Sequence, residues 1–455
     1  MKLNKLRLKN FQGFDEKEII FSENFNVLVG ENGSGKTAIT KAISIAFSAF
    51  ISKLIEGTEK QISQSDIRCK EIIFDEIITV EPQYPSEIHC NMSFDECFEY
   101  DYLYDYHLYD GELEWSCERH KSSGYIITNE EKLVDITYDI QDTVQDGEKS
   151  QLPIFASYTT NRLWTINNLK EGFTPQTPKS RFVGYKDFLN PYTNENEFIN
   201  WFIQMSIAEI KSNKPLKILN SIKKAISNCL KVVNIAKIDY APFSNEILAI
   251  TTQGDTIPLR LLSDGYRSII GLVADIAYRM AVLNPFLDNH LETPGIILID
   301  EIDLHLHPKW QRNIVNDLKS TFPNVQFIVT THSPFIVQSL SSGELQTLDN
   351  RMTKQLVSPD KFVNKSLEDV TTSVMGITHP QRNEKLQRLY ELTKEYYLLI
   401  KNSLDPSNSN SHPQQDIQSL KLEIDELSSL FSDNVAYHAI LEIEREELKR
   451  KGKKQ

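Results

Sequence analysis

The chain has 455 residues and a formal net charge of −14. This length can bury a large core and suits one elaborated domain or two. The acidic balance argues against a protein that coats DNA through a broadly basic surface, although a local basic groove would still attract phosphates. The five cysteines are scattered and form no C-x-x-C pair, which predicts neither a zinc site nor a disulfide framework.

The same sequence argues against a membrane location. No apolar stretch approaches the roughly 20 residues needed to span a bilayer. Lysine and asparagine interrupt the N-terminal region, where a signal peptide would have its apolar core. We therefore expect a cytoplasmic protein with reduced thiols and no membrane partner.

The first predicted strand, residues 25–29, runs directly into a glycine-rich segment. Apolar residues at helical spacing after it, among them Ile39, Ile43 and Phe47, predict a helix that starts at the segment itself. The segment matches the pattern G-x-x-x-x-G-K-[ST] and reads Gly30, Glu31, Asn32, Gly33, Ser34, Gly35, Lys36 and Thr37.

This segment predicts a phosphate-binding loop. Its glycines let successive backbone N–H groups point at phosphate oxygens, and the N-terminus of the following helix favours negative charge. Lys36 is then placed to reach the β- and γ-phosphates of ATP, and the Thr37 hydroxyl to hold Mg²⁺. The alternative, a glycine-rich turn of a hairpin, does not account for the strand and the helix on either side.

Strand-like segments rich in acids and tyrosines follow over residues 70–150, and we interpret them as a β-rich insertion. Tyrosines at every second position from Tyr100 to Tyr106 predict a strand with one aromatic face. Such a stripe can stack nucleic-acid bases. Because the opposite face is acidic and would repel phosphate, we favour a core position or a protein contact. Residues 196–232 are predicted to be helical.

A second candidate anion site follows. Leu262-Ser263-Asp264-Gly265 is predicted to form a tight turn that opens a helix with a buried apolar face. A helix N-terminus that carries a serine hydroxyl can hold an anion. A plain N-cap at Ser263 is the alternative.

Two acids follow a predicted buried strand. Residues 295–299 form a continuous apolar run, which is typical of a parallel strand covered on both faces. Asp300 is placed to hold Mg²⁺ through water, and Glu301 to orient or deprotonate an attacking water. An ordinary strand exit would look the same, and the phosphate loop upstream favours the functional interpretation.

A further buried strand is predicted over residues 325–329, and His332 follows it. His332 would lie beside the γ-phosphate and sense it, although a lone histidine at a strand end is more often structural. Between the two strands, His305 and His307 stand two positions apart. Because no second ligand pair accompanies them, we interpret residues 304–308 as a subunit-contact loop rather than a metal site.

The C-terminal part of the chain contains no strand ending in acidic metal ligands, so no nuclease domain is predicted there. Helical periodicity indicates helices over residues 383–404, 414–431 and about 435–450, with a linker over 405–413. The basic end, residues 449–454, is interpreted as solvated, with a contact to DNA or to an acidic partner as the alternative.

The chain resembles the heads of the RecF, Rad50, SMC and OLD ABC ATPases in two features. These are the N-terminal phrase from Leu6 to Phe14 and the acids Asp300-Glu301 followed by Leu306-His307-Pro308. Transporter heads generally lack both. Residues 152–164, 262–278 and 376–382 narrow the resemblance to compact bacterial ATPases that accompany nucleases in phage defence, most closely the Septu ATPase subunits. Retron-associated ATPases share these stretches.

The resemblance implies an α/β fold, an ABC-ATPase head made of a phosphate-loop parallel sheet, an antiparallel β lobe and a helical lobe. We expect the head to span residues 1–345 and a mainly helical docking region to span 346–455. SMC and Rad50 relatives insert long coiled-coil arms where this chain has residues 196–232. That segment is far too short for arms, so we expect a compact head.

By the same resemblance, Lys36 and Thr37 bind ATP and Mg²⁺, while Asp300, Glu301 and His332 run or gate hydrolysis. Together with Lys36, we take Glu301 and His332 as the catalytic candidates.

The segment Ser263-Asp264-Gly265 corresponds to the ABC signature. Since a single ABC head cannot bring its signature to its own phosphate loop, Ser263 and Gly265 would contact the γ-phosphate held by a second copy. Asp264 and Tyr266 replace the usual third and fifth residues of L-S-G-G-Q, which leaves the strength of ATP-driven dimerisation open.

Two further placements rest on the resemblance alone. Thr160, Asn161 or Arg162 would take the place of the glutamine that links nucleotide to the helical lobe. Residues 10–12 (Asn10, Phe11 and Gln12) would approach the adenine or ribose.

The function implied is that of an ATPase subunit in a two-component anti-phage system. It forms at least a head-to-head dimer and controls a partner HNH nuclease that docks through the C-terminal helices, with DNA as a further candidate partner. The alternative is a RecF-like DNA-repair ATPase that clamps DNA. A transporter ATPase would need a membrane partner, and the N-terminal phrase counts against it.

Overall fold

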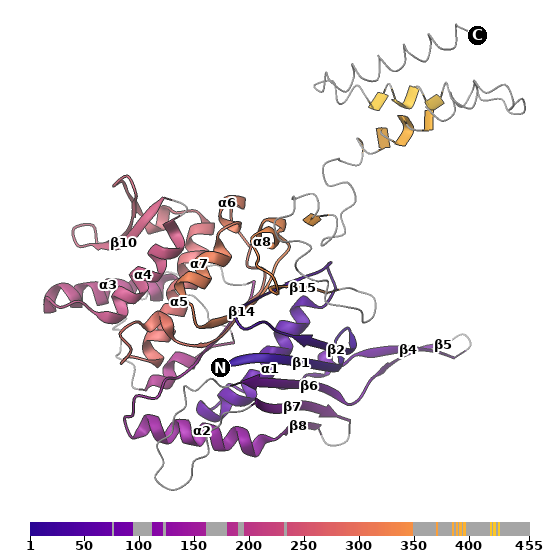
Figure 1. Ribbon diagram of the computed structural model, residues 1–455, viewed down its shortest axis with the longest axis horizontal. Coiled ribbons are helices and arrows are strands. Elements are labelled where there is room, and N and C mark those ends of the chain that lie inside the picture. The colour runs from indigo at the N-terminus through magenta and orange to yellow at the C-terminus, as the bar shows by residue number, and fades with distance from the viewer. Residues whose placement is uncertain are drawn as a thin grey trace, which may run out of the picture. The chain divides into compact units, whose positions relative to one another are not determined.

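The computed structural model describes residues 1–74, 77–93, 112–121, 124–160, 180–189, 195–231, 234–348 and 370–371, together with short groups of residues between 385 and 427. The chain divides into two compact units, Met1–Val370 and Thr371–Gln455. The larger unit carries the labelled helices and strands of Figure 1.

A parallel sheet of five strands forms the centre of the larger unit. Its strands are β3 (Phe25–Val29), β9 (Ile154–Tyr158), β13 (Gly295–Ile299), β14 (Val325–Thr330) and β15 (Leu345–Thr347). Their order is β15-β3-β14-β13-β9, and every neighbouring pair runs parallel. All residues of β3, β9, β13 and β14 are buried, which explains their mostly apolar sequences, because a parallel sheet is covered on both faces.

The strand order decides where the candidate functional segments meet. β14 lies between β3 and β13, so three predicted strands are confirmed and are adjacent in the sheet. The glycine-rich loop follows β3, the two acids follow β13, and His332 follows β14. Because the carboxyl ends of parallel strands share one edge of the sheet, all three segments lie along that edge.

A second sheet is antiparallel and also has five strands, in the order β2-β1-β6-β7-β8. Its strands are β1 (Lys2–Phe11), β2 (Phe14–Ile20), β6 (Ser86–Ser93), β7 (Glu112–His120) and β8 (Gly124–Thr128). Helix α1 (Lys36–Leu54) contacts β1, β6 and β7 of this sheet and β14 of the parallel sheet. The Trp115 indole donates a hydrogen bond to the Ala46 carbonyl at 3.2 Å, which ties the antiparallel sheet to α1.

Helix α1 is buried on almost every side. By length and apolar composition it is also the one described helix that could cross a membrane, and 78% of that stretch is buried inside the protein. The expectation that no apolar stretch approaches spanning length is therefore wrong for α1. Its position between two sheets is that of a core helix.

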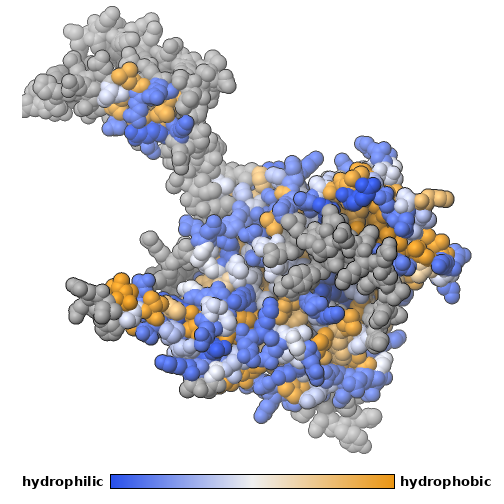
Figure 2. All heavy atoms as spheres, turned by 180° about the vertical axis from the view of Figure 1, so that it is seen from behind, coloured by the Kyte–Doolittle hydropathy of each residue, from blue (hydrophilic) through white to orange (hydrophobic). Residues whose placement is uncertain are grey.

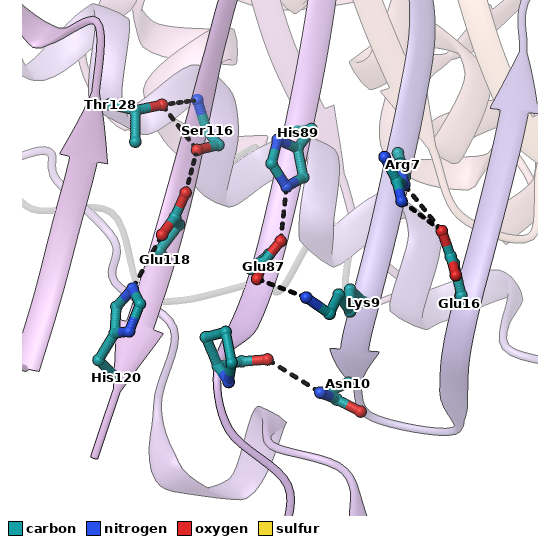
Figure 3. Close-up of polar contacts among 11 residues, drawn as sticks. Arg7, Lys9, Asn10, Glu16, Glu87, His89, Ser116, Glu118, His120 and Thr128 are labelled. Carbon is teal, nitrogen blue, oxygen red and sulfur yellow. Dashed lines mark hydrogen bonds and ion pairs between the residues drawn. The ribbon is translucent and has the colours of Figure 1, made fainter.

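The outward face of the antiparallel sheet carries charges that pair with one another (Figure 3). Arg7 Nη2 lies 2.5 Å from Glu16 Oε1. Glu87 accepts from Lys9 Nζ at 2.9 Å and lies 2.8 Å from His89 Nε2. Burial alone would raise the pKa of Glu87, but the hydrogen bonds from His89 and Lys9 hold this pKa below its ordinary value.

A two-stranded hairpin, β4 (Cys69–Phe74) and β5 (Ile77–Pro82), projects from the antiparallel sheet (Figure 1). Ile73, Ile78 and Val80 on it are 69%, 63% and 60% exposed. Figure 2 shows apolar residues along this projection, on the left of the view. An isolated hairpin is only marginally stable in water, and these apolar residues add nothing to the core.

The helical part of the larger unit is built around α5 (Asp264–Leu283), which contacts α4 (Lys217–Leu230). Helix α3 (Glu195–Ser212) contacts α4 in turn. The helical prediction for 196–232 is therefore confirmed as two helices. The other helices of this unit are α2 (Glu130–Gln145), α6 (Pro308–Gln311), α7 (Ile314–Thr321) and α8 (Pro334–Gln338).

Sequence analysis did not predict the three-stranded sheet after α4. It is antiparallel and consists of β10 (Ile235–Ala241), β11 (Glu246–Thr251) and β12 (Thr256–Pro258). Its central strand alternates between buried and partly exposed residues, a pattern of only six residues that is easily overlooked.

The expectation of strands throughout residues 70–150 is wrong at its end, because Glu130–Gln145 forms α2. The strands before α2 also do not form a separate insertion. β6, β7 and β8 extend the sheet begun by β1 and β2, so they belong to the body of the head. The tyrosine stripe from Tyr100 to Tyr106 lies outside the described residues.

In the smaller unit, the described residues of the predicted helices 383–404 and 414–431 are helical. Leu389, Leu392 and Ile424 are buried against one another, so the two helices pack together. The linker, the third predicted helix, the basic end and residues 376–382 lie outside the described residues.

Candidate nucleotide site

The glycine-rich loop between β3 and α1 has the backbone that its sequence requires. Gly33 and Gly35 adopt left-handed conformations, with φ of 83° and 94°, which residues with a side chain rarely adopt. At Gly30 an added Cβ would lie 2.5 Å from Ser34 Oγ and 2.7 Å from the Leu348 carbonyl oxygen. Only glycine therefore fits this first position of the loop.

Lys36 folds back over the loop. Its Nζ donates to the carbonyl oxygens of Gly30 at 2.6 Å and Glu31 at 3.0 Å. Burial lowers the pKa of Lys36, while the nearby charges of Asp300 and Glu301 act in the opposite direction. The structure thus brings the predicted lysine and the two predicted acids together across the edge of the sheet.

The N-terminal phrase reaches the loop through Phe14, which sequence analysis did not single out. A Cβ added to Gly35 would lie 2.3 Å from the Phe14 ring, so the ring rests directly on the loop. Asn10 donates to the Pro85 carbonyl at 3.0 Å and Gln12 to Asp66 at 2.9 Å, and Phe11 is fully buried. These three residues hold the turn between β1 and β2.

The two acids that follow β13 share one hydroxyl group. Thr330 Oγ1 donates to Asp300 Oδ1 at 2.5 Å and accepts the backbone N–H of Glu301 at 2.7 Å. Glu301 adopts a left-handed backbone, with φ of 49°. Thr330, at the end of the adjacent strand β14, therefore fixes the direction in which both carboxylates leave the sheet. Sequence analysis missed this role.

A third acid of the same loop anchors the segment that carries His332. Thr331 Oγ1 donates to Asp303 Oδ1 at 2.5 Å, and the His332 backbone N–H points at the same oxygen at 3.4 Å. His332 is exposed, at the edge of the sheet that also bears the loop and the acids. Asp303 was not predicted, although it stands two residues after Glu301 in a segment already marked as functional.

The predicted signature segment opens α5 at Ser263. The Ser263 side chain makes no capping hydrogen bond, so its hydroxyl is not used as a plain N-cap. A Cβ on Gly265 would lie 2.5 Å from the His305 carbonyl oxygen, which explains the glycine. Asp264 forms an ion pair with Arg267 one turn along the helix.

The structure does not join the signature segment to the phosphate loop of its own chain. Within the described residues, no recorded hydrogen bond or ion pair connects Ser263, Asp264 or Gly265 with residues 30–37. The segment instead packs on the loop that follows the acids.

A buried network connects the parallel sheet to α5. The Tyr158 hydroxyl donates to Asp275 Oδ2 at 2.7 Å, and Arg279 Nε donates to the same oxygen at 2.7 Å. Burial raises the pKa of Tyr158 well above its usual value. Thr160 follows β9 at this edge, while Asn161 and Arg162 lie outside the described residues. The strand before the predicted linking residues is thus tied to the signature helix.

The residues fit the hard, oxygen-rich coordination of Mg²⁺. Thr37 is exposed at the start of α1, and the Asp300 carboxylate lies at the same edge of the sheet. Magnesium usually keeps several waters and takes one or two protein oxygens together with phosphates. In the part of the chain that the structure describes, no group of three or more His, Cys, Asp or Glu side chains suits a metal, so a site made only of protein ligands is not seen there.

The Thr330 hydroxyl provides a direct test of this geometry. Replacing Thr330 with valine keeps the shape but leaves the Glu301 N–H and one Asp300 oxygen without this partner. We expect ATP turnover to fall about 10- to 100-fold, since such hydrogen bonds contribute about 1–3 kcal/mol. The measurement is steady-state ATPase activity, with Thr137→Val, a buried threonine of α2, as the control. Unchanged turnover in Thr330→Val would contradict the assigned role.

Comparison with known proteins assigns most of this chain to a family. Residues 25–338 match the family AAA_21, described as "AAA domain, putative AbiEii toxin, Type IV TA system". That range contains the phosphate loop, the signature segment, the two acids and His332. It covers more than half of the chain.

Two curated relatives match over most of their length. The "Retron Vc95 probable ATPase" of Vibrio cholerae serotype O1 biovar El Tor is 25% identical over 87% of this chain and 84% of its own. The "Septu protein PtuA" of Bacillus thuringiensis is 23% identical over 89% of this chain and 95% of its own.

A solved SMC head domain from Thermotoga maritima aligns with a TM-score of 0.41 and 16% identity, over 76% of this chain and 94% of that one. The family match, the phosphate loop and the parallel sheet of the larger unit all indicate an ATPase. The chain belongs to the AAA_21 family and is an ATPase with an α/β fold.

Proposed function

We propose that this ATPase is the regulatory subunit of a two-component anti-phage defence system and controls a separate HNH nuclease. The observation that carries the proposal is the near full-length similarity to a Septu protein and to a retron ATPase, combined with the phosphate loop, the two acids and His332 at one edge of the parallel sheet. In this proposal the chain carries no nuclease chemistry of its own.

Each proposed role follows from a position at the edge of the sheet. Backbone N–H groups of residues 30–37 and the Lys36 ammonium bind the triphosphate. Thr37 and Asp300 hold Mg²⁺, which supplies charge neutralisation when it is bound. Glu301 orients or deprotonates the attacking water, and His332 contacts the γ-phosphate.

The second proposed half of the site comes from another copy. Ser263 and Gly265 lie on the opening turn of α5 and are not joined to the phosphate loop of their own chain. In a head-to-head dimer they would face the γ-phosphate held by the neighbour. ATP occupancy would then set whether two heads engage, which gives a means of controlling a partner.

The smaller unit is the proposed docking platform for the nuclease. Leu389, Leu392 and Ile424 give its helices a core of their own, separate from the ATPase head. Such a unit can be lost without removing any proposed ATP ligand. We therefore expect that deletion of residues 383–455 leaves ATP binding intact and abolishes association with the nuclease.

The test is a pull-down of the tagged full-length protein from its native operon, with and without ATP, followed by the same experiment on the deletion. A co-purifying HNH subunit that is lost on deletion supports the proposal. If the deletion protein still holds its partner, the docking assignment is wrong.

A RecF-like DNA clamp is the second candidate. The RecF protein of Oceanobacillus iheyensis is 36% identical over 66 residues, which is 14% of this chain. A lone protein that dimerises with ATP and binds DNA with steep salt dependence would favour this candidate over the defence function.

A further inference from the structure

A pocket of about 350 Å³ lies beside the signature segment, apart from the phosphate loop of the same chain. It is lined by Asn234, Ser263, Gly265, Tyr266, His305, His307, Lys309 and Trp310. Of these, only Ser263 and Gly265 belong to the segment for which a nucleotide role is proposed. The others come from the loop after the acids and from the elements around it.

The walls of the pocket are held by close packing. Gly265 and the His305 carbonyl approach so closely that no side chain fits between them, and His305 takes a left-handed backbone, with φ of 64°. Trp310 is 2% exposed, and its indole donates to the Cys229 carbonyl at 3.3 Å. The Tyr266 ring lies against Trp310 with centroids 4.9 Å apart. Tyr266, which replaces the usual glutamine, thus forms an aromatic wall of the pocket together with Trp310.

The rim of the pocket is rich in hydrogen-bond donors. His307 Nδ1 accepts the backbone N–H of Lys309 at 3.2 Å, so a neutral His307 ring carries its proton on Nε2 and can donate it. Lys309 is exposed, and its ammonium forms no recorded ion pair with a described carboxylate. The Ser263 hydroxyl adds a third donor.

The Asp264 carboxylate of the signature segment does not neutralise the hydrogen-bond donors around this pocket. The Asp264 carboxylate is paired with Arg267 and is not among the residues that line the pocket. A lysine, a histidine N–H and a hydroxyl around one cavity suit an anion with several oxygens.

We propose that His307 and Lys309 of one copy bind the triphosphate held by the phosphate loop of a second copy, beside Ser263. This inference rests on the proposed head-to-head dimer and adds two positioning residues to it. They supply donors in trans in place of the side-chain amide of the usual glutamine, which Tyr266 replaces at the fifth position of the signature. The loop that carries His307 and Lys309 begins at Glu301. The residues that contact the neighbour's ATP and the proposed general base therefore lie on one short segment.

The experiment uses the full chain with Glu301→Gln, so that ATP is bound but turned over slowly. Two quantities are measured: ATP affinity at a protein concentration where the chain is monomeric, and the dimer dissociation constant in saturating ATP by sedimentation. In this background Lys309→Ala is expected to weaken the dimer about 100-fold, because the symmetric dimer loses two charge-assisted hydrogen bonds, each worth about tenfold. The monomer's ATP affinity is expected to stay unchanged, because the contact is made to the other copy's nucleotide.

Matched variants separate this role from a structural one. His307→Asn can still accept the Lys309 N–H but loses the Nε2 donor, and it should also weaken the dimer. Lys309→Arg should retain most of the dimer affinity. Lys217→Ala, a lysine in a surface ion pair with Asp288, should have no effect.

A dimer constant unchanged by Lys309→Ala, or a loss of ATP affinity in the monomer, would overturn the inference. So would a parent protein that binds ATP and never dimerises. The proposed function fails differently: the parent protein then shows no ATP binding at all, or the wild type associates with no nuclease.

Discussion

Replacement of Glu301 with glutamine is expected to slow ATP hydrolysis by at least about 100-fold, while ATP still binds. General-base assistance is worth about 10²–10⁴ in rate, and glutamine keeps the size of the side chain but cannot take a proton. The measurement is single-turnover hydrolysis together with nucleotide affinity. Loss of turnover with retained affinity is the result that identifies a residue acting on the water and not on the nucleotide.

The structure gives a specific reason to expect retained binding. The backbone of Glu301 is fixed by the hydrogen bond between its N–H and Thr330 Oγ1, which the substitution leaves in place. Asp300 keeps its own bond to the same hydroxyl. Only the carboxylate charge is lost, so the loop, the proposed Mg²⁺ ligands and Lys36 keep their positions.

A matched control lies at the opposite end of the same strand. Glu292 is an exposed carboxylate just before β13, whereas Glu301 comes just after it. Glu292→Gln should leave turnover unchanged. If Glu301→Gln also hydrolyses ATP at the wild-type rate, another group activates the water and Glu301 loses its assigned role.

The core of the fold was predictable because it depends on unbroken apolar runs. β3, β13 and β14 are wholly buried, and each is followed by a segment whose residue types already indicate phosphate or metal chemistry. Because these strands are parallel, their carboxyl ends share one edge of the sheet. The short strands β10 to β12 were missed because seven or fewer residues with a weak alternation cannot be told from a loop.

Side chains that act through other residues were not predictable. Thr330 looks like an ordinary strand residue, and its role depends on β14 lying between β3 and β13, which is a property of topology. Phe14 was part of a recognised phrase, yet only the fold brings its ring onto Gly35. The helix at 130–145 was missed because its mean composition is polar and acidic, although Leu133, Ile136 and Ile140 form its buried side.

Removal of the Lys36 side chain is expected to weaken ATP binding by about 30- to 150-fold. A charge-assisted hydrogen bond in such a site contributes about 2–3 kcal/mol, and the remaining backbone N–H groups of the loop keep part of the affinity. Lys36→Ala is measured by titration with a fluorescent ATP analogue. Turnover should fall at least as far, because Lys36 also lies beside the two acids.

The same substitution should not destabilise the nucleotide-free protein. Burial lowers the pKa of Lys36, so the folded state disfavours the charged ammonium compared with the unfolded chain. This cost is fully present at pH values below the folded pKa and is relieved as the pH rises from there toward the unfolded value. Lys36→Ala should therefore melt at the wild-type temperature or above it.

Lys53 provides the control for a lost charge on the same helix. It lies in the last turn of α1 and is paired with Glu130 at the surface, so Lys53→Ala should bind ATP normally. If Lys36→Ala loses ATP binding together with a large fall in melting temperature, Lys36 is mainly a structural residue. Loss of ATP binding at an unchanged melting temperature would mean that the desolvated Lys36 ammonium serves triphosphate binding and not the stability of the fold.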